Sequence, residues 1–317
     1  MTAREFQLAD LPPGATAPPR SRLGELLHRL VGPFRRGTPP APQPAAGFYT
    51  DTTVCIGCKA CEVACKQWNQ LPADGFGFTG DSYDNTGGLS ATSWRHVKFV
   101  EQFADVLPDR SRRVPLEVIP PPPTPAVPTL DRWLMMSDVC KHCAAAPCQQ
   151  ACPTGAILHN EFANVYIQAD ICNGCAYCIA ACPFGVITRA DFDGHAHKCT
   201  LCYDRQKDGL VPACAKACPT ASIQFGPLAE LRERARRRVE QLHARGVTGA
   251  YLYGDAPTDT YTELHSFYLL ADRPEVYGLP AKPVNPWLHM RGDYLRTLLT
   301  GVVTLAALFA AVLAWGG

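Results

Sequence analysis

The segment CNGCAYCIAACP, at residues 172–183, decides the fold of this chain. Its cysteines follow the spacing C-x2-C-x2-C-x3-C, and the same spacing recurs in CIGCKACEVAC at residues 55–65. Three closely spaced thiolates can hold three irons of a cubane cluster, because a tight loop turns successive sulfurs inward while backbone amides donate to the cluster sulfides. The fourth iron then needs a sulfur from another part of the chain.

All sixteen cysteines belong to four such runs, and none lies outside them. The second run widens the middle gap to four residues and the fourth run widens it to eleven, and both end in C-x3-C-P. The runs are Cys55, Cys58, Cys61 and Cys65; Cys140, Cys143, Cys148 and Cys152; Cys172, Cys175, Cys178 and Cys182; and Cys199, Cys202, Cys214 and Cys218. In two-cluster ferredoxins the last cysteine of one run binds the cluster of its partner run. Four runs therefore predict two pairs and four [4Fe–4S] clusters with every cysteine a metal ligand, although spacing alone does not choose which runs pair.

Zinc and disulfides are the alternative uses of these cysteines. Structural zinc sites take two separate C-x2-C pairs, and a third and fourth cysteine in each run are unnecessary for a tetrahedral ion. Disulfides suit small secreted chains, whereas 317 residues with 47% hydrophobic content can bury a real core. Both alternatives explain the cysteine spacing less well than [4Fe–4S] clusters that take their fourth sulfur from a partner run.

Basic side chains lie within or beside the runs: Lys59, Lys66, Lys141, Lys198 and Lys216. Positive charge there favours a reduced, more negative cluster, while solvated lysines explain the same pattern without any redox role. His142 lies between Cys140 and Cys143. Because every run already has four sulfurs, we expect this histidine beside a cluster or at the surface.

No catalytic motif competes with electron transfer. The sequence contains no G-x-S-x-G motif, no Walker loop and no dinucleotide fingerprint. A formal net charge of +1 without a dense basic tract argues against a nucleic-acid partner. We therefore expect an electron carrier with no catalytic residue of its own.

Composition divides the chain into four parts. Residues 1–48 form a Pro-rich flexible extension, and residues 49–226 form the four-cluster domain with an insertion at 66–139. Within the insertion, the segment from Arg95 to Val100 alternates like a strand. Residues 227–286 form a helix and a C-terminal cover segment; Pro227 opens the helix, and Gly246 closes it. The predicted fold class is α+β, with two ferredoxin-like double-[4Fe–4S] modules, loop insertions and a single C-terminal transmembrane helix.

The last part, residues 287–317, is the predicted membrane anchor. Residues 297–315 carry no charge, and as a helix they extend about 28 Å, which spans a bilayer core. Trp287, Tyr294 and Trp315 flank this segment as interface anchors. A buried helix of a soluble protein is the alternative. The sequence opens without the apolar core of a secretory signal peptide.

With these motifs in hand, the chain resembles the iron–sulfur (beta) subunits of membrane-bound molybdopterin oxidoreductases, most closely those of nitrate-inducible formate dehydrogenases. The likeness runs from about Phe48 to the C-terminus. Its segments are DTTVCIGCKACEVACKQWN, YDNTGGLSATSW, CNGCAYCIAACPFG, HKCTLCYDR, PACAKACPT and the terminal helix. Two features depart from the family: the Pro-rich extension, and a chain that stops at Gly317 directly after the helix.

The resemblance implies that the first run pairs with the fourth and the second with the third. The implied ligand sets are Cys55, Cys58, Cys61 and Cys218; Cys199, Cys202, Cys214 and Cys65; Cys140, Cys143, Cys148 and Cys182; and Cys172, Cys175, Cys178 and Cys152. The family takes electrons from a catalytic (alpha) subunit with a molybdenum or tungsten pterin and passes them to a membrane cytochrome b (gamma) subunit that reduces quinone. The alternative partners are those of a dimethyl sulfoxide reductase, polysulfide reductase or hydrogenase complex.

Two signals disagree on the side of the cell membrane that carries the cluster domain. Lys282, Arg291 and Arg296 precede the helix and no charge follows it, which favours a cytoplasmic domain. The resemblance implies export on the catalytic subunit's signal and therefore a periplasmic domain, because a folded cargo need not obey a loop-charge rule. We expect the periplasmic side, with the cytoplasmic side as the alternative.

Overall fold

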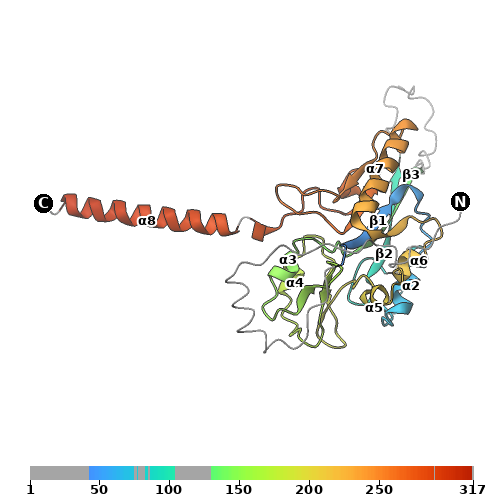
Figure 1. The fold of residues 1–317 in the computed structure, drawn as a ribbon, viewed down its shortest axis with the longest axis horizontal. Coiled ribbons are helices and arrows are strands. Elements are labelled where there is room, and N and C mark those ends of the chain that lie inside the picture. Colours follow the sequence, from blue (N-terminus) through green and yellow to red (C-terminus); the bar gives the residue numbers. More distant parts are fainter. Residues whose placement is uncertain are drawn as a thin grey trace, which may run out of the picture.

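A four-stranded sheet brings the two ends of the cysteine-rich region together (Figure 1). The computed structural model describes residues 43–74, 77, 83–84, 86–103, 130–288 and 290–315. The strand order is β8-β1-β10-β9. The strands are β1 (Ala46–Asp51), β8 (Ile223–Pro227), β9 (Tyr251–Tyr253) and β10 (Ser266–Leu270). β1 is antiparallel to β8 and parallel to β10, so segments far apart in sequence form the centre of the fold.

Helix α7 (Leu228–Ala244) covers one face of this sheet. Its buried side chains Leu228, Leu231, Ala235 and Leu242 pack in one cluster with Tyr49, Phe267 and Leu269. Successive side chains of a strand point to opposite faces. Accordingly Phe48 and Tyr268 point to the other face, where they join the core that contains the cysteines. The predicted helix is confirmed, with Pro227 at its N-cap.

The insertion contributes a long antiparallel hairpin of β2 (Arg95–Phe103) and β3 (Leu130–Val139). This confirms the strand expected from Arg95. The Pro-dense part of the insertion, residues 115–128, lies outside the described residues. Arg95 pairs with Val139, so the base of the hairpin is fixed beside the second cysteine run.

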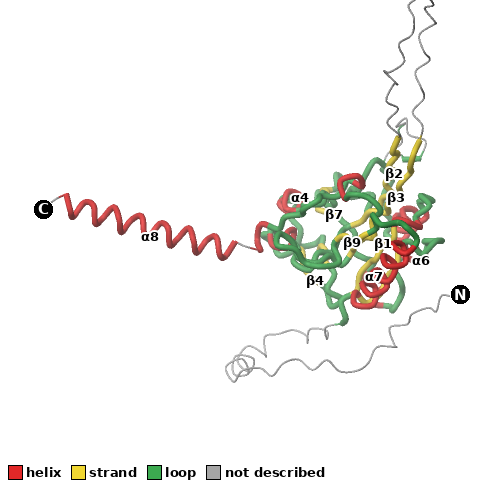
Figure 2. The backbone as a smooth tube through the Cα atoms, turned by 90° about the horizontal axis from the view of Figure 1, so that it is seen from above, coloured by secondary structure: helices red, strands yellow, loops and turns green. Residues whose placement is uncertain are grey.

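Short helices and hairpins carry the cysteine runs (Figure 2). The helices are α2 (Ala60–Trp68), α3 (Pro147–Gln150), α4 (Tyr177–Ala181), α5 (Tyr203–Lys207) and α6 (Ala213–Lys216). The hairpins are β4 (Ile157–His159) with β5 (Val165–Ile167), and β6 (Thr188–Arg189) with β7 (Ala196–His197). The structure also has three short 3-10 turns: η3 (Thr52–Val54), η4 (Pro274–Tyr277) and η5 (Pro286–Leu288). Mixed helix and strand content agrees with the predicted class.

The C-terminal helix α8 (Met290–Trp315) extends away from the rest of the molecule (Figures 1 and 2). Its segment Gly292–Ala311 has a mean hydropathy of 1.6, and none of it is buried. By length and composition it is able to cross a membrane. The helix begins before the expected start at residue 297, because the segment with Arg291, Asp293 and Arg296 adds about two polar turns at its N-terminal end.

The boundary expected at residue 48 needs a correction. β1 begins at Ala46, whose amide donates to the carbonyl of Phe162, and Phe48 is fully buried. Residues 46–48 therefore belong to the folded body, because they supply the central strand. Residues 43–45 of the expected extension are also described, and residues 1–42 lie outside the described residues.

Candidate iron–sulfur centres

All four cysteine runs have a residue in the left-handed backbone conformation at the same place. The residue before the second cysteine has a positive φ in every run: Gly57 at 65°, His142 at 44°, Gly174 at 71° and Leu201 at 56°. Lys59 and Ala176, directly after that cysteine in the first and third runs, have φ of 58° and 66°. Turns of this kind direct successive N–H groups into a concavity that suits an anion. The loops are therefore shaped to surround a negatively charged group.

Sulfurs of the first and fourth runs line one cavity of about 290 Å³. Its cysteines are Cys55, Cys58, Cys61 and Cys218, which we call set A. The sheet explains this meeting, because Cys55 follows the end of β1 and Cys218 precedes the start of β8. Antiparallel pairing of Thr50 with Ile223 places these two ends side by side.

Cys65 meets the remaining sulfurs of the fourth run. Burial raises the pKa of the Cys65 thiol well above its usual value, and the thiols of Cys199, Cys214 and Cys202 raise it further. Helices α2 and α6, which carry Cys65 and Cys214, pack against each other, and both lie beside α5 in Figure 1. Cys65, Cys199, Cys202 and Cys214 form set B.

Sulfurs of the second and third runs line a second cavity of about 310 Å³. Its cysteines are Cys140, Cys143, Cys148 and Cys182, which we call set C. The short helices α3 and α4 pack together and bring Cys148 close to the third run. The Tyr261 hydroxyl donates a short hydrogen bond to the Cys143 sulfur.

The last four sulfurs form set D, which consists of Cys152, Cys172, Cys175 and Cys178. Burial raises the pKa of Cys178 to about 11, and the thiols of Cys172, Cys152 and Cys175 add to the effect. The structure thus brings all sixteen cysteines into the four groups that the family resemblance implies. Their assignment as ligands stays a prediction, which the substitutions below test.

The four sets follow one another in a row, A-B-C-D. Burial is the main cause that raises the pKa of Cys61 in set A, Cys199 in set B and Cys148 in set C. In each case a thiol of the next set raises it further: Cys214 for Cys61, Cys140 for Cys199 and Cys178 for Cys148. At the ends of the row, Cys58 and Cys175 are exposed.

The raised pKa values of the thiols fit the binding of iron–sulfur clusters, whose iron ions stabilise thiolates. Burial raises the pKa of Cys61 to about 11 and that of Cys148 to about 12. These thiols are neutral in the protein alone, whereas metal ligands must be thiolates. Among the described residues, no three His, Cys, Asp or Glu side chains converge closely enough to hold a single metal ion. The sulfurs instead surround cavities.

Buried cations lie near the sets, and they have different partners. Lys141 donates to the carboxylate of Asp138 and to the Val139 carbonyl, while Lys198 donates to the carbonyls of Val165 and Cys199. Both lysines are buried, so the interpretation as solvated lysines is wrong for them. It suits Lys216, which is exposed.

His142 is fully buried, so of the two expected positions the surface is excluded and the position beside a cluster remains. Burial lowers its pKa well below the usual value, with Lys198 as the next cause, and the ring is therefore neutral. Neither ring nitrogen has a hydrogen-bond partner in the described part of the chain. His142 has a left-handed φ of 44° and lies in the loop that carries Cys140 and Cys143 of set C.

Sequence reasoning missed three side chains that contact or face the sulfurs: Arg95, Ser137 and Tyr261. Ser137 and Tyr261 lie in strand β3 and in the cover segment, far along the chain from the sulfurs they contact, and no local motif marks them. Arg95 had a signal, because it shares one face of its strand with Val97 and Phe99, so a charge interrupts an apolar face.

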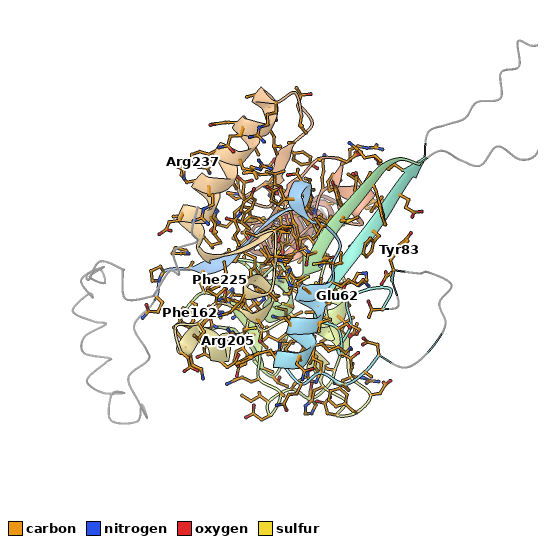
Figure 3. The ribbon with its side chains drawn as sticks, turned by 90° about the vertical axis from the view of Figure 1, so that its right-hand side faces the viewer. Glu62, Tyr83, Phe162, Arg205, Phe225 and Arg237 are labelled. Carbon is orange, nitrogen blue, oxygen red and sulfur yellow. The ribbon has the colours of Figure 1, made fainter. Side chains whose placement is uncertain are left out.

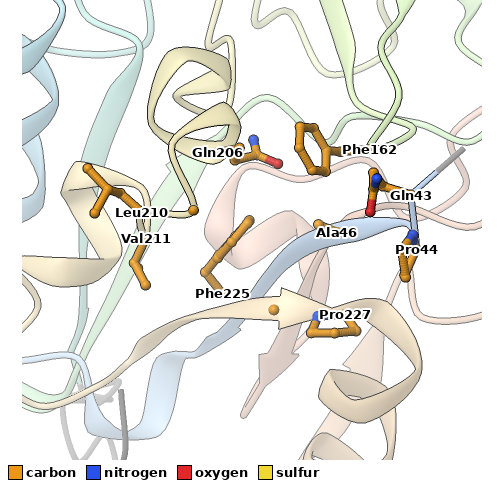
Figure 4. Close-up of a pocket in the computed structure, with 11 residues that line it drawn as sticks. Gln43, Pro44, Ala46, Phe162, Gln206, Leu210, Val211, Phe225 and Pro227 are labelled. Carbon is orange, nitrogen blue, oxygen red and sulfur yellow. The ribbon is translucent and has the colours of Figure 1, made fainter. Parts of the chain in front are cut away.

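A cavity of about 540 Å³ lies apart from the cysteines (Figure 4). Its lining includes Gln43, Phe162, Leu210 and Phe225, and it contains no sulfur. It is largely apolar and belongs to none of the four sets.

Comparison with known proteins identifies iron–sulfur domains in this chain. Two family profiles, both described as 4Fe-4S dicluster domain, match residues 54–156 and 131–228. The nitrate-inducible formate dehydrogenase iron-sulfur subunit of Escherichia coli (strain K12) is 40% identical over 237 residues, which cover 74% of this chain and 71% of the relative. The chain belongs to the family of formate dehydrogenase iron–sulfur subunits.

Two further relatives show the breadth of similarity. The formate dehydrogenase-O iron-sulfur subunit of the same organism is 39% identical over 258 residues, 78% of this chain and 76% of the relative. A subunit of the anaerobic dimethyl sulfoxide reductase of E. coli is 30% identical over 193 residues, 59% of this chain and 76% of the relative. Like the formate dehydrogenase iron–sulfur subunits, this chain is an electron-transfer subunit rather than a catalytic one. With sixteen cysteines in two dicluster domains, it carries four [4Fe–4S] clusters.

Proposed function

We propose that the protein conducts electrons along sets A to D, from a catalytic subunit that oxidises formate at a molybdenum or tungsten pterin to a membrane cytochrome b that reduces quinone. Bound clusters supply one-electron redox chemistry at each set. The observation that carries the proposal is the unbroken row of four sulfur sets with an exposed cysteine at each end. The name of the 40% identical relative supports formate as the substrate of the complex.

The position of helix α8 supports electron flow from set A towards set D. The side chain of Asn285 donates to the Ala145 carbonyl at 3.0 Å, and η5 packs against α3, which carries Cys148 of set C. Sets C and D therefore lie at the base of α8, whereas α2 and α6 with sets A and B lie on the far side (Figure 1). An electron that travels along the row approaches the proposed membrane surface.

We propose that α8 anchors the protein in the cell membrane. Its segment Gly292–Ala311 is 20 residues long, about 30 Å as a helix, and exposed along its length. Small residues on the helix suit close packing against a membrane helix of the cytochrome subunit: Gly301, Ala306, Ala307, Ala310 and Ala311. The family resemblance favours a periplasmic cluster domain. Protease digestion of intact spheroplasts should then degrade the cluster domain, and protection would place it in the cytoplasm.

The exposed ends of the row carry apolar side chains that suit docking. Ile56 and Val63, next to set A, are 58% and 66% exposed. Tyr177, next to set D, is 62% exposed. Exposed apolar side chains around a functional group mark protein contact sites. We assign the set A end to the catalytic subunit and the set D end to the cytochrome.

A second candidate is the same role beside a dimethyl sulfoxide reductase, which the 30% identical relative favours. The test is to purify the native complex anaerobically and assay formate-dependent dye reduction. We expect formate to reduce the dye, and deletion of residues 289–317 to release the catalytic and iron–sulfur subunits from membranes without loss of that activity. A purified complex that oxidises a reduced dye with dimethyl sulfoxide, and is inert to formate, would contradict the formate assignment.

A further inference from the structure

Arg95 is a buried guanidinium without a carboxylate partner in the part of the chain that the structure describes. It is 2% exposed, at the start of β2, and its guanidinium carbon lies 4.8 Å from the centre of the Phe48 ring. The only hydrogen bond of its side chain among the described residues runs from Nη1 to the Ser137 hydroxyl, at 3.0 Å. Nε and Nη2 have no partner there, and no described carboxylate forms an ion pair with Arg95. Arg95 is therefore a positive charge that the carboxylates of the described residues leave uncompensated.

Burying a charge is unfavourable unless an opposite charge or a set of hydrogen bonds compensates it. The buried Lys141 meets this condition through Asp138, and Lys198 meets it through two carbonyl groups. The Arg95 guanidinium stays charged, because arginine is not deprotonated in proteins. Burial lowers the pKa of Arg95, but the nearby thiols of Cys214, Cys61 and Cys199, together with the Tyr268 hydroxyl, raise it more.

These sulfurs come from two different sets. Cys61 belongs to set A, whereas Cys199 and Cys214 belong to set B. Helix α2 carries Cys61 of set A and Cys65 of set B one turn apart, and it packs against β2, which begins at Arg95. Arg95 therefore lies beside both sets. One cation faces two centres of negative charge.

Ser137 links Arg95 to set A directly. An arginine side chain only donates hydrogen bonds, so the Ser137 oxygen accepts from Nη1. The same oxygen lies 3.2 Å from the Cys61 sulfur. Its single hydroxyl proton is thereby free to point at that sulfur, and the order of donors is Arg95 to Ser137 to Cys61.

We propose that Arg95 is the shared counter-charge of the clusters in sets A and B, and that Ser137 transmits its effect to Cys61, so that both reduction potentials are raised. Reduction adds one electron to a cluster, and a fixed cation stabilises the more negative state. In this role Arg95 contacts no substrate or partner subunit. It holds a positive charge in a fixed position beside the two clusters. The inference rests on the ligand sets proposed above.

The test is an anaerobic potentiometric titration of the full-length protein with its clusters, followed by electron paramagnetic resonance. Signals of sets A and B are assigned from Cys218→Ala and Cys65→Ala, which each disturb one set. In Arg95→Gln we expect the equilibrium constant for reduction of each of the two clusters to fall about tenfold. This equals a decrease of about 59 mV in the one-electron reduction potential. In Ser137→Ala only the set A potential should fall. Unchanged potentials in Arg95→Gln, with four clusters present, would overturn the proposal.

Two controls separate charge from structure. Arg237→Gln removes the same charge from the exposed face of α7, where Arg237 pairs with Glu233, and it should leave all potentials unchanged (Figure 3). Arg95→Lys retains the charge and should restore most of the set A and set B potentials. If Arg95→Gln does not assemble clusters, Ser137→Ala decides: a shift confined to set A supports the proposal, and no shift overturns it. A wild-type protein without four clusters would refute the ligand sets instead.

Discussion

The half of the molecule that holds sets A and B and the half that holds sets C and D share one cysteine pattern but differ in their buried charges. In the A and B half, the cation Arg95 has no carboxylate partner among the described residues. In the C and D half, Lys141 is held by Asp138, whose pKa lies well below its usual value because Lys141 and Lys98 outweigh burial. Cysteine spacing thus sets the type of cluster, whereas the residues around each half set its electrostatics.

The two halves also differ in what connects them to the rest of the protein. The sheet of β8, β1 and β10 closes the A and B half, because β1 leads into the first run and β8 follows the fourth. The C and D half instead meets the cover segment, through Tyr261 at Cys143 and Asn285 at Ala145. The first connection positions the start of the electron path, and the second positions its end beside α8.

Removal of the sulfur that crosses between runs should have the largest effect. Cys218→Ala takes one of four sulfurs from set A, and we expect the set A cluster to be lost or converted to a three-iron form. The other three clusters should keep their signals. Cys152→Ala is the matched variant in the other half and should disturb set D alone. Iron analysis and electron paramagnetic resonance check both, and an intact set A signal in Cys218→Ala would refute the crossed pairing.

Acid should destabilise the C and D half through His265. Burial lowers the pKa of this histidine to about 4, and its Nδ1 donates to the Ala163 carbonyl at 2.9 Å. Its folded-state pKa is below the unfolded value near 6.5, so the unfolded chain binds more protons between pH 6.5 and 4. Stability from this group is present above pH 6.5 and falls as the pH is lowered, by on the order of 2 kcal/mol at pH 5.

Urea unfolding midpoints at pH 7 and pH 5, measured anaerobically, check the role of His265. His265→Gln should show a smaller loss of stability at pH 5 than the wild type. His243→Gln on α7, which leaves the C and D half untouched, is the control and should behave like the wild type. An equal acid response in wild type and His265→Gln would exclude this histidine as the cause.

The smallest effect is expected from the hydrogen bond that Tyr261 donates to Cys143 in set C. Tyr261→Phe deletes the hydroxyl that donates to Cys143 and keeps the ring that packs edge-on against Phe184. A hydrogen bond to a charged sulfur that strengthens on reduction contributes roughly 1 kcal/mol, or about 40 mV for one electron. We expect the set C potential to fall by that amount and the set A potential to stay constant. Potentiometric titration of both signals measures the difference.

Much of the site follows from sequence, and the reasons are local. Four cysteines close together in the chain define a loop whatever surrounds it, so each run predicts a cluster. The helix after Pro227 and the strand after Arg95 are predictable because their periodic patterns are long. The pairing of runs needs the family resemblance, since spacing does not report which distant loops meet.

The remaining features depend on contacts between distant segments. β1 and β10 pair in parallel although about two hundred residues separate them, and strands of five or six residues carry little signal of their partner. Arg95, Ser137 and Tyr261 act on sulfurs of other segments, so no motif surrounds them. The burial of His142 is not predictable from sequence, because a polar residue between two predicted ligands can be either buried or exposed.

The central claim is that sixteen sulfurs hold four [4Fe–4S] clusters, each joining two remote segments. The most direct test is the iron, zinc and acid-labile sulfide content of protein isolated without oxygen. We predict about sixteen irons and sixteen sulfides per chain, as four clusters of four require, and no zinc. Material that contains zinc, and that takes up neither iron nor sulfide on reconstitution, would contradict the account.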